Sequence, residues 1–406
     1  MSDSGSSDPN DPFSGLPFFG DLSKLFGGGA GFGAPTDGPV NWEAARQFAV
    51  GLANGGTSEP NVDPALRAKF AELSRIAELQ VASATGLDLT VDGRVPVVVP
   101  LTRAEWAVRT LTDYRPLLEQ LAGGLADDAS ADDPNDPAAA LLSGVMKMIA
   151  PAMMAMSAGS MVGHLATRAL GAHHLPIPRG AATDLPVVGP NVSDFVEEWS
   201  IDRDEVALWL CVHELLFHAV FNVQHVRDVL VQLLGEYASG FQQADGGALE
   251  QRLGSLEPTG DLGDMQAQIQ RMFGDPEVLL GAMRTPAQEA MLPRLEALIA
   301  IIVGWVDHHL DAIGGQLIGG HGQIAEAMRR RRVTAGPQDR FVERMLGLDL
   351  RRELVERGRA FVDGVVERDG AERLADLWSK PEHLPTPNEV DAPGLWLARI
   401  DLPDLD

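Results

Sequence analysis

The chain has 406 residues, enough for one large or two medium domains, and its hydrophobic fraction of 45% is ordinary for a globular protein. A formal net charge of −26 argues against nucleic acid as a partner, because the phosphates would be repelled. The longest apolar runs, such as Leu298 to Val303, are too short to span a bilayer.

The beginning of the chain points to a protein that stays in the cytoplasm. It has neither a basic n-region nor an apolar h-region, and the single cysteine, Cys211, permits no internal disulfide. Residues 1–38 are rich in Gly, Ser, Pro and Asp without periodicity, which predicts a disordered tail. We therefore expect ordered structure to begin near Asn41.

Helices with one short strand are predicted for the next part of the chain. Asp63-Pro64 is typical of a helix start, with Pro at the first helical position. Val95 to Pro100 reads as an edge strand because of its prolines, and Thr102 to Glu105 forms a capping box that opens another helix. Apolar residues at helical spacing define two earlier helices, at Trp42, Ala45, Phe48, Ala49 and Leu52 and at Leu66, Phe70, Leu73, Ile76 and Leu79.

The remaining chain predicts a mainly α fold with minor, short β-strands. Residues 141–170 are rich in Met, Ala and Gly, which favours a closely packed helix pair broken at Pro151. We expect one helical domain over 39–395, with flexible inserts near 126–137 and 244–263 and an acidic tail at 396–406. Residues 186–191 are expected to be a short extended or loop piece. A helix, continuous or with a break, is expected from about 202 to 239, and further helices at 264–273, 276–283, 286–312, 321–332, 338–346 and 350–368.

The most informative motif lies in the helix expected after residue 200. Zinc peptidases carry H-E-x-x-H, whose two His lie on one helix face and whose Glu takes a proton from a zinc-bound water. This chain has His213 and Glu214, but Phe217 occupies the second ligand position. His218 is five residues after His213, about 140° around a regular helix. Both His can therefore reach one metal only if the helix is bulged near Phe217.

A structural interpretation competes with the metal site. Leu210, His213, Phe217 and Phe221 share one apolar stripe, so His213 is equally well explained as a core histidine that bonds a buried acceptor. Cys211 has apolar neighbours and is expected to be inert packing.

Further candidate ligands come from two other segments. Asp307 and His308 lie late in an apolar helix, where they could be zinc ligands or simply a polar helix end. His173 and His174 lie in a predicted loop. The basic run Arg329 to Arg332 follows a helical stretch, so we expect a solvated helix end more than a site for an acidic partner.

Several short segments of this chain, in the same order, resemble the zincin-like metallopeptidase type 2 family of actinobacteria and their relatives. Members of that family are often labelled as hydrolases or as coenzyme F420 biosynthesis-associated proteins. The resemblance covers residues 40 to about 390. It rests on Gly159 to Gly163, Leu170 to Pro178, Pro190-Asn191, Leu208-Trp209, His213-Glu214, His225 to Arg227, Gly304 to Asp307, Arg329 to Arg332 and Leu374 to Trp378.

The resemblance implies a helical zincin-like fold, with zinc held by the motif. His213 then matches the first ligand and Glu214 the catalytic base, while Phe217 replaces the second ligand. The family pattern also tends to place a Glu where this chain has Val303. A catalytic zinc usually has three protein ligands, so activity would require rebuilding the site from residues such as His218, His308 and Asp307.

Three functions stay open at this stage. The first is a non-catalytic family member that binds or regulates a protein or peptide partner. The second is an active zinc-dependent hydrolase with shifted ligands, and the third is a metal-free protein that binds a small molecule or cofactor. A small-molecule site would require an apolar pocket with converging polar groups, and the oligomeric state is left undetermined.

Overall fold

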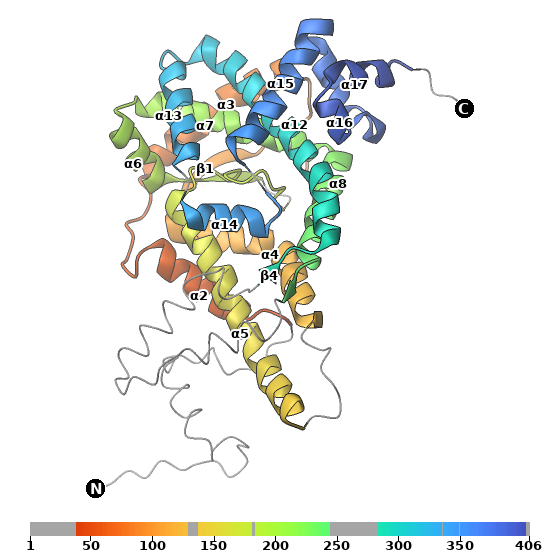
Figure 1. Ribbon diagram of the computed structural model, residues 1–406. Coiled ribbons are helices and arrows are strands. Elements are labelled where there is room, and N and C mark those ends of the chain that lie inside the picture. Colours follow the sequence, from red (N-terminus) through yellow and green to blue (C-terminus); the bar gives the residue numbers. More distant parts are fainter. Residues whose placement is uncertain are drawn as a thin grey trace.

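Helices make up most of the computed structural model (Figure 1), as the sequence predicts. The structure describes residues 38–128, 137–180, 183–243, 282–334, 336–348 and 350–402. The predicted N-terminal tail, the core of both predicted inserts, the helix predicted at 264–273 and nearly all of the one at 276–283 lie outside these residues.

The elements of the first half surround a two-stranded sheet. They are α2 (Trp42–Ala53), α3 (Pro64–Thr85), β1 (Val97–Leu101), α4 (Arg103–Asp128), α5 (Pro137–Arg168), β2 (Asp184–Val188), α6 (Gly189–Trp199), α7 (Arg203–Asn222) and α8 (Gln224–Ser239).

The second half is almost entirely helical. It contains β3 (Gln242–Gln243), β4 (Ala282–Met283), α12 (Pro286–Leu317), α13 (His321–Val333), α14 (Pro337–Met345), α15 (Arg352–Asp369), the 3-10 helices η1 (Ala371–Trp378) and η2 (Pro381–His383), α16 (Pro387–Val390) and α17 (Pro393–Ile400).

Local capping signals explain where several helices begin. The side chain of Asp63 accepts a hydrogen bond from the backbone N–H of Ala65 at the start of α3. At the start of α4, the backbone N–H of Thr102 donates to Glu105 and the backbone N–H of Glu105 donates to the Thr102 hydroxyl. Both predicted helix starts are therefore confirmed, because these bonds depend only on nearby residues.

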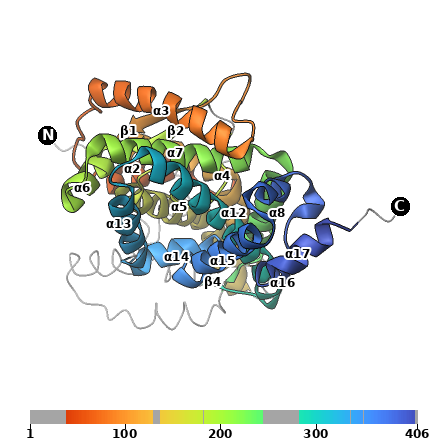
Figure 2. The same cartoon turned by 90° about the horizontal axis from the view of Figure 1, so that it is seen from above.

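The small sheet joins two segments that are far apart in the sequence. Strand β1 pairs in parallel with β2, with Val97 opposite Asp184 and Leu101 opposite Val188. The backbone N–H of Val188 also donates to the carbonyl of Leu170, the residue before the loop 171–180. Figure 2 shows both strands lying beneath α3 and beside α7. The sheet thus holds one end of that loop near the central helix.

Helix α5 differs from its prediction, since it runs through Pro151 without a break. Proline costs one intrahelical hydrogen bond, and packing against α2 offsets that loss. The approach is close because Gly159 and Gly163 have no side chains: a Cβ on Gly159 would lie 2.5 Å from the carbonyl oxygen of Ala45. The small residues of this segment do permit close packing, here against α2, but the predicted helix pair and its break at Pro151 are wrong, because the segment forms one helix.

Helix α7 is largely buried and meets α8, which lies nearer the side of the molecule, at a sharp bend of 89° (Figure 1). The bend falls at Val223, whose backbone is extended. In the described ranges no single helix is long and apolar enough to cross a membrane, although α7 and α8 taken together reach that length and composition. The break that the sequence allowed within 202–239 is thus confirmed.

Two further segments depart from the predictions. Residues 186–191 were expected to be loop or extended, but helix α6 begins at Gly189 and continues to Trp199. The acidic tail was expected from residue 396, yet α17 continues to Ile400 and Trp396 is fully buried against Phe361. Packing of one aromatic side chain therefore extends the ordered chain beyond the predicted boundary.

Candidate functional site

Helix α7 carries the His-Glu motif into the core. Asp202 caps the helix through bonds from the backbone N–H groups of Asp204 and Glu205. The helix is α-helical from Arg203 to Asn222, without the bulge that a shifted ligand set would require. His213 is nearly buried and Glu214 is completely buried.

Three N–H groups surround the carboxylate of Glu214. Its Oε2 lies 2.9 Å from the backbone nitrogen of His173 and 2.8 Å from the Nδ1 of the same residue. Its Oε1 lies 3.1 Å from the Nδ1 of His213. The loop can come this close because residue 171 is glycine: a Cβ there would lie 2.0 Å from Oε1. Glu214 therefore anchors the loop to α7.

The protonation of this cluster follows from its bonds. Burial opposes the charge on Glu214, but the His173 and His213 rings outweigh burial and hold the pKa of the carboxyl well below its usual range. Burial lowers the pKa of His173 in spite of the adjacent carboxylate. Glu214 is thus ionised and His173 neutral, with the Nδ1–H of His173 donating to Glu214 and its Nε2 left as an acceptor.

Phe217 fills the position of the second zinc ligand. Its ring stacks on His173, with centroids 5.4 Å apart, and meets the edge of His213 at 4.9 Å. Trp209, one turn earlier, stacks on the other side of His213 at 5.1 Å. An aromatic stack therefore occupies the face of α7 on which the family motif would place two ligands.

The other predicted ligands are engaged in separate contacts. The Nε2 of His218 donates to the carbonyl of Leu89 at 3.0 Å. Asp307 pairs with Arg332 at 3.4 Å, and the ring of His308 contacts that of His309. No three of the His, Cys, Asp and Glu side chains in the described ranges come close enough together to hold a metal ion.

Zinc therefore does not fit the residues present at the motif. Only His213 remains from the expected pair of ligands on α7, and its Nδ1 is bonded to Glu214. A catalytic zinc requires three protein ligands with an open position. The aromatic ring of Phe217 has no metal-binding atom, and the helix shows no distortion that would move His218 to its place.

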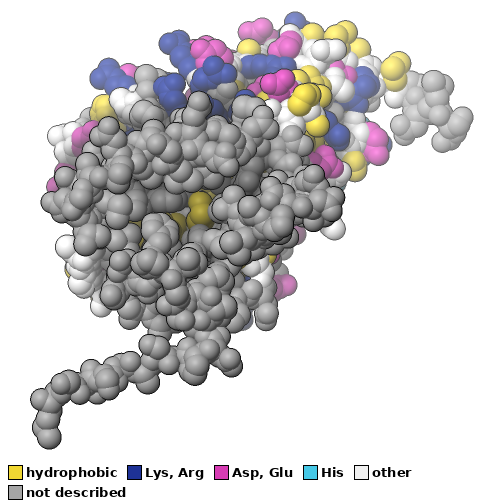
Figure 3. Space-filling model, turned by 60° about the horizontal axis from the view of Figure 1, so that its bottom comes forward, with side chains coloured by type: hydrophobic (Ala, Val, Ile, Leu, Met, Phe, Trp, Pro, Cys, Tyr) yellow, Lys and Arg dark blue, Asp and Glu magenta, His cyan; other side chains and the backbone are white. Residues whose placement is uncertain are grey.

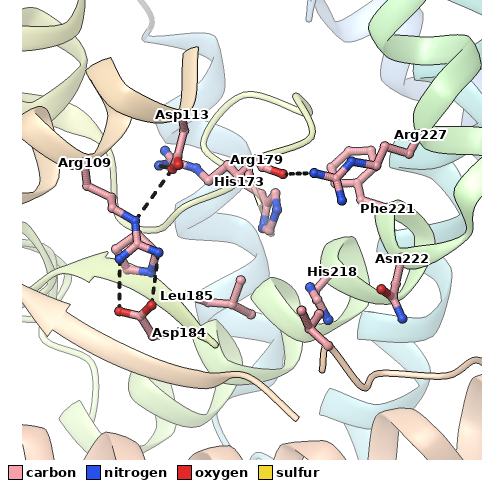
Figure 4. A pocket seen from close by; sticks show the side chains of 13 residues that line it. Arg109, Asp113, His173, Arg179, Asp184, Leu185, His218, Phe221, Asn222 and Arg227 are labelled. Carbon is pink, nitrogen blue, oxygen red and sulfur yellow. Dashed lines mark hydrogen bonds and ion pairs between the residues drawn. The ribbon is translucent and has the colours of Figure 1, made fainter. Parts of the chain in front are cut away.

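A small polar pocket opens beside this cluster (Figure 4). Its volume of about 30 Å³ has room for roughly two or three water molecules. Its polar side chains come from α4, the loop 171–180, β2, α7 and α8, and they are Arg109, Asp113, His173, Arg179, Asp184, His218, Asn222 and Arg227. The pocket therefore joins His173 to a set of charged groups.

Sequence reasoning missed most of this pocket. The sequence predicts His173 only as a further candidate ligand, and no motif in it marks Arg179 or Asp113. Arg179 donates to Asp113 at 2.9 Å, to the hydroxyl of Thr110 and to the carbonyl of Ala172. Two segments that carry the family resemblance, Leu170 to Pro178 and His225 to Arg227, also supply pocket residues. They are the signal in the sequence that could have located the pocket.

The buried His213-Glu214 pair on α7 keeps the first two residues of the H-E-x-x-H motif of zinc peptidases. The family model for zincin-like metallopeptidases matches residues 40–397, so the chain belongs to that family. No curated protein matches the chain.

A crystal structure of a candidate hydrolase with a novel fold, from Chloroflexus aurantiacus, is similar to 90% of this chain and to 99% of that protein. The TM-score is 0.58 and the sequence identity 21%. This likeness establishes a shared fold.

Proposed function

We propose that this protein is a non-catalytic member of the zincin-like metallopeptidase family and acts by binding a ligand. The observation that carries the proposal is the environment of Glu214, whose two oxygens accept three N–H groups while Phe217 covers the adjacent face of α7. In this role, the inherited His-Glu pair holds the loop 171–180 against the central helix.

The state of Glu214 argues against its use as a catalytic base. A general base must reach the proton that it abstracts and needs a pKa near the working pH. The carboxyl of Glu214 is inaccessible to solvent, and its pKa is held well below the usual range. Its lone pairs already face His173 and His213, so a water molecule would have to displace one of these bonds.

The set of possible zinc ligands also argues against catalysis. A zinc ion held by His213 alone would lack the two further ligands that a catalytic site uses. Replacing Phe217 by His would restore the two-His spacing on one helix face, but the new ring would take the space between His173 and His213. The wild-type side chain instead contributes packing.

Metal content tests the proposal. Untagged protein would be purified without chelator, exposed to zinc, dialysed and measured by mass spectrometry, with Phe217→His and His213→Ala in parallel. We expect wild type to retain much less than one zinc per chain. About one zinc per chain in wild type, lost in His213→Ala, would instead indicate a rebuilt catalytic site.

A further inference from the structure

One of the three arginines that line the pocket has no ion-pair partner among the described residues. Arg109 pairs with Asp184 at 3.0 Å, and Arg179 pairs with Asp113 at 2.9 Å. Arg227 lines the same pocket, where it donates to the carbonyl of Arg179 and pairs with no carboxylate of the described residues. Arg227 is thus the one arginine of the pocket without an ion-pair partner among these residues.

The position of Arg227 strengthens this positive character. It lies in the first turn of α8, whose N-cap residue Val223 provides no side-chain acceptor. The preceding residues Phe221 and Asn222 also line the pocket, so the positive end of the helix lies close by. Arg227 uses one guanidinium nitrogen to donate to the carbonyl of Arg179 (Figure 4). Its remaining N–H groups can bind an anion.

The two histidines of the pocket, His173 and His218, provide hydrogen-bond acceptors. His173 donates its Nδ1–H to Glu214, so its Nε2 is an acceptor. His218 donates its Nε2–H to Leu89, so its Nδ1 is an acceptor. Figure 4 shows Arg227, His173 and His218 around the same space. A ligand that satisfies all three needs both a negative charge and a hydrogen-bond donor.

We infer that this pocket binds a small hydroxy carboxylate, with the carboxylate at Arg227 and the hydroxyl group donating to His173 or His218. One arginine without an ion-pair partner suits one carboxylate group, which favours a carboxylate over a doubly charged phosphate. The small volume admits the acidic end of a ligand, while the rest extends toward solvent. This inference rests on the proposed binding role and names the ligand class for it.

Acetate and glycolate form a matched pair of probes, because they differ only by the hydroxyl group. Each would be titrated into the full-length protein, and the ring signals of His173 and His218 would be followed by NMR, with inorganic phosphate as a third probe. Arg227→Gln removes the guanidinium group that has no ion-pair partner. Arg75→Gln is the control, since Arg75 is an exposed arginine on α3 that does not line the pocket.

We expect glycolate to shift both signals saturably and to bind about 3- to 10-fold more tightly than acetate, the worth of one neutral hydrogen bond. Arg227→Gln should weaken glycolate at least about tenfold, and Arg75→Gln should not. Equal affinity for acetate and glycolate, tighter binding of phosphate, or unchanged binding in Arg227→Gln would each overturn the inference. Because none of these measurements depends on zinc, the inference can fail while the metal-content result for the proposed function stands.

Discussion

At the scale of single residues, Glu214 shows how a catalytic residue type can serve structure. A buried carboxylate is costly unless it is fully hydrogen-bonded, and here three N–H groups compensate for the lost water. The same bonds fix the loop that carries His173 and the pocket. Cys211, on the same helix, is also inert, because burial raises the pKa of its thiol to about 12.

Glu214→Gln should lower the free energy of unfolding by about 1–3 kcal/mol, because a neutral amide cannot accept all three bonds and strands a buried donor. Urea unfolding at pH 7 measures the loss. Glu367→Gln, on the exposed side of α15, is the matched control and should stay within about 0.5 kcal/mol of wild type.

The same variant has a defined pH dependence. The folded-state pKa of Glu214 lies below the unfolded value of 4.5, so its stabilisation is complete above pH 4.5 and is lost as the pH falls through the folded pKa. The difference between wild type and Glu214→Gln should therefore shrink only in acid. A difference that disappears at neutral pH would contradict an ionised Glu214.

At the scale of elements, close helix contacts depend on glycines. Helices α12 and α15 cross where Gly304 meets Gly358, and a Cβ on Gly304 would lie 2.4 Å from the backbone carbon of Gly358. Since α12 also packs on α7 and α8, this crossing supports the helices that carry the site.

Gly304→Ala should destabilise the protein by about 1–3 kcal/mol, because two backbones would have to separate. Gly315→Ala is the control on the same helix: a Cβ there meets nothing within 4 Å, so alanine should stabilise by roughly 0.5–1 kcal/mol. Thermal unfolding of both variants separates packing from helix propensity. Equal effects in both would show that the crossing is loose.

At the scale of the whole molecule, the acidic chain uses its arginines mainly for internal contacts. Arg329 and Arg330 pair with Glu326, Arg331 donates to the carbonyl of Arg168, and Arg332 pairs with Asp307. On the described surface in Figure 3, basic and acidic side chains lie beside one another. The basic run at the end of α13 is thus bound within the chain.

Stability should fall as the pH is lowered from about 6.5 to about 4. Burial lowers the pKa values of His174, His218 and His309 to about 4, from an ordinary value of 6.5. Between these values the unfolded chain binds more protons than the folded one, so protonation favours unfolding. The urea midpoint measured across this range should decline, and His218→Gln should reduce the slope. An unchanged slope in that variant would contradict a neutral, half-buried His218.

Much of the fold could be predicted because its signals are local. The capping residues Asp63, Thr102 and Glu105 and the apolar spacing of α2, α3 and α12 depend on neighbours within a few turns. Pro151 and Trp396 misled the prediction, since α5 continues and α17 is ordered through packing on distant helices. Rules based on local sequence use the helix preference of each residue but not the distant packing contacts that can override that preference.

The sequence by itself determined that the chain is mainly helical and that Phe217, four residues after His213, lies on the same helix face, because helical spacing alone decides which side chains share a face. Only the tertiary structure decided what Glu214 does. Its partner His173 lies 41 residues away in a loop without periodicity, and Arg227 reaches the pocket only because α8 turns by 89° from α7. Such contacts depend on how the helices and the loop pack together, and no local pattern encodes that packing.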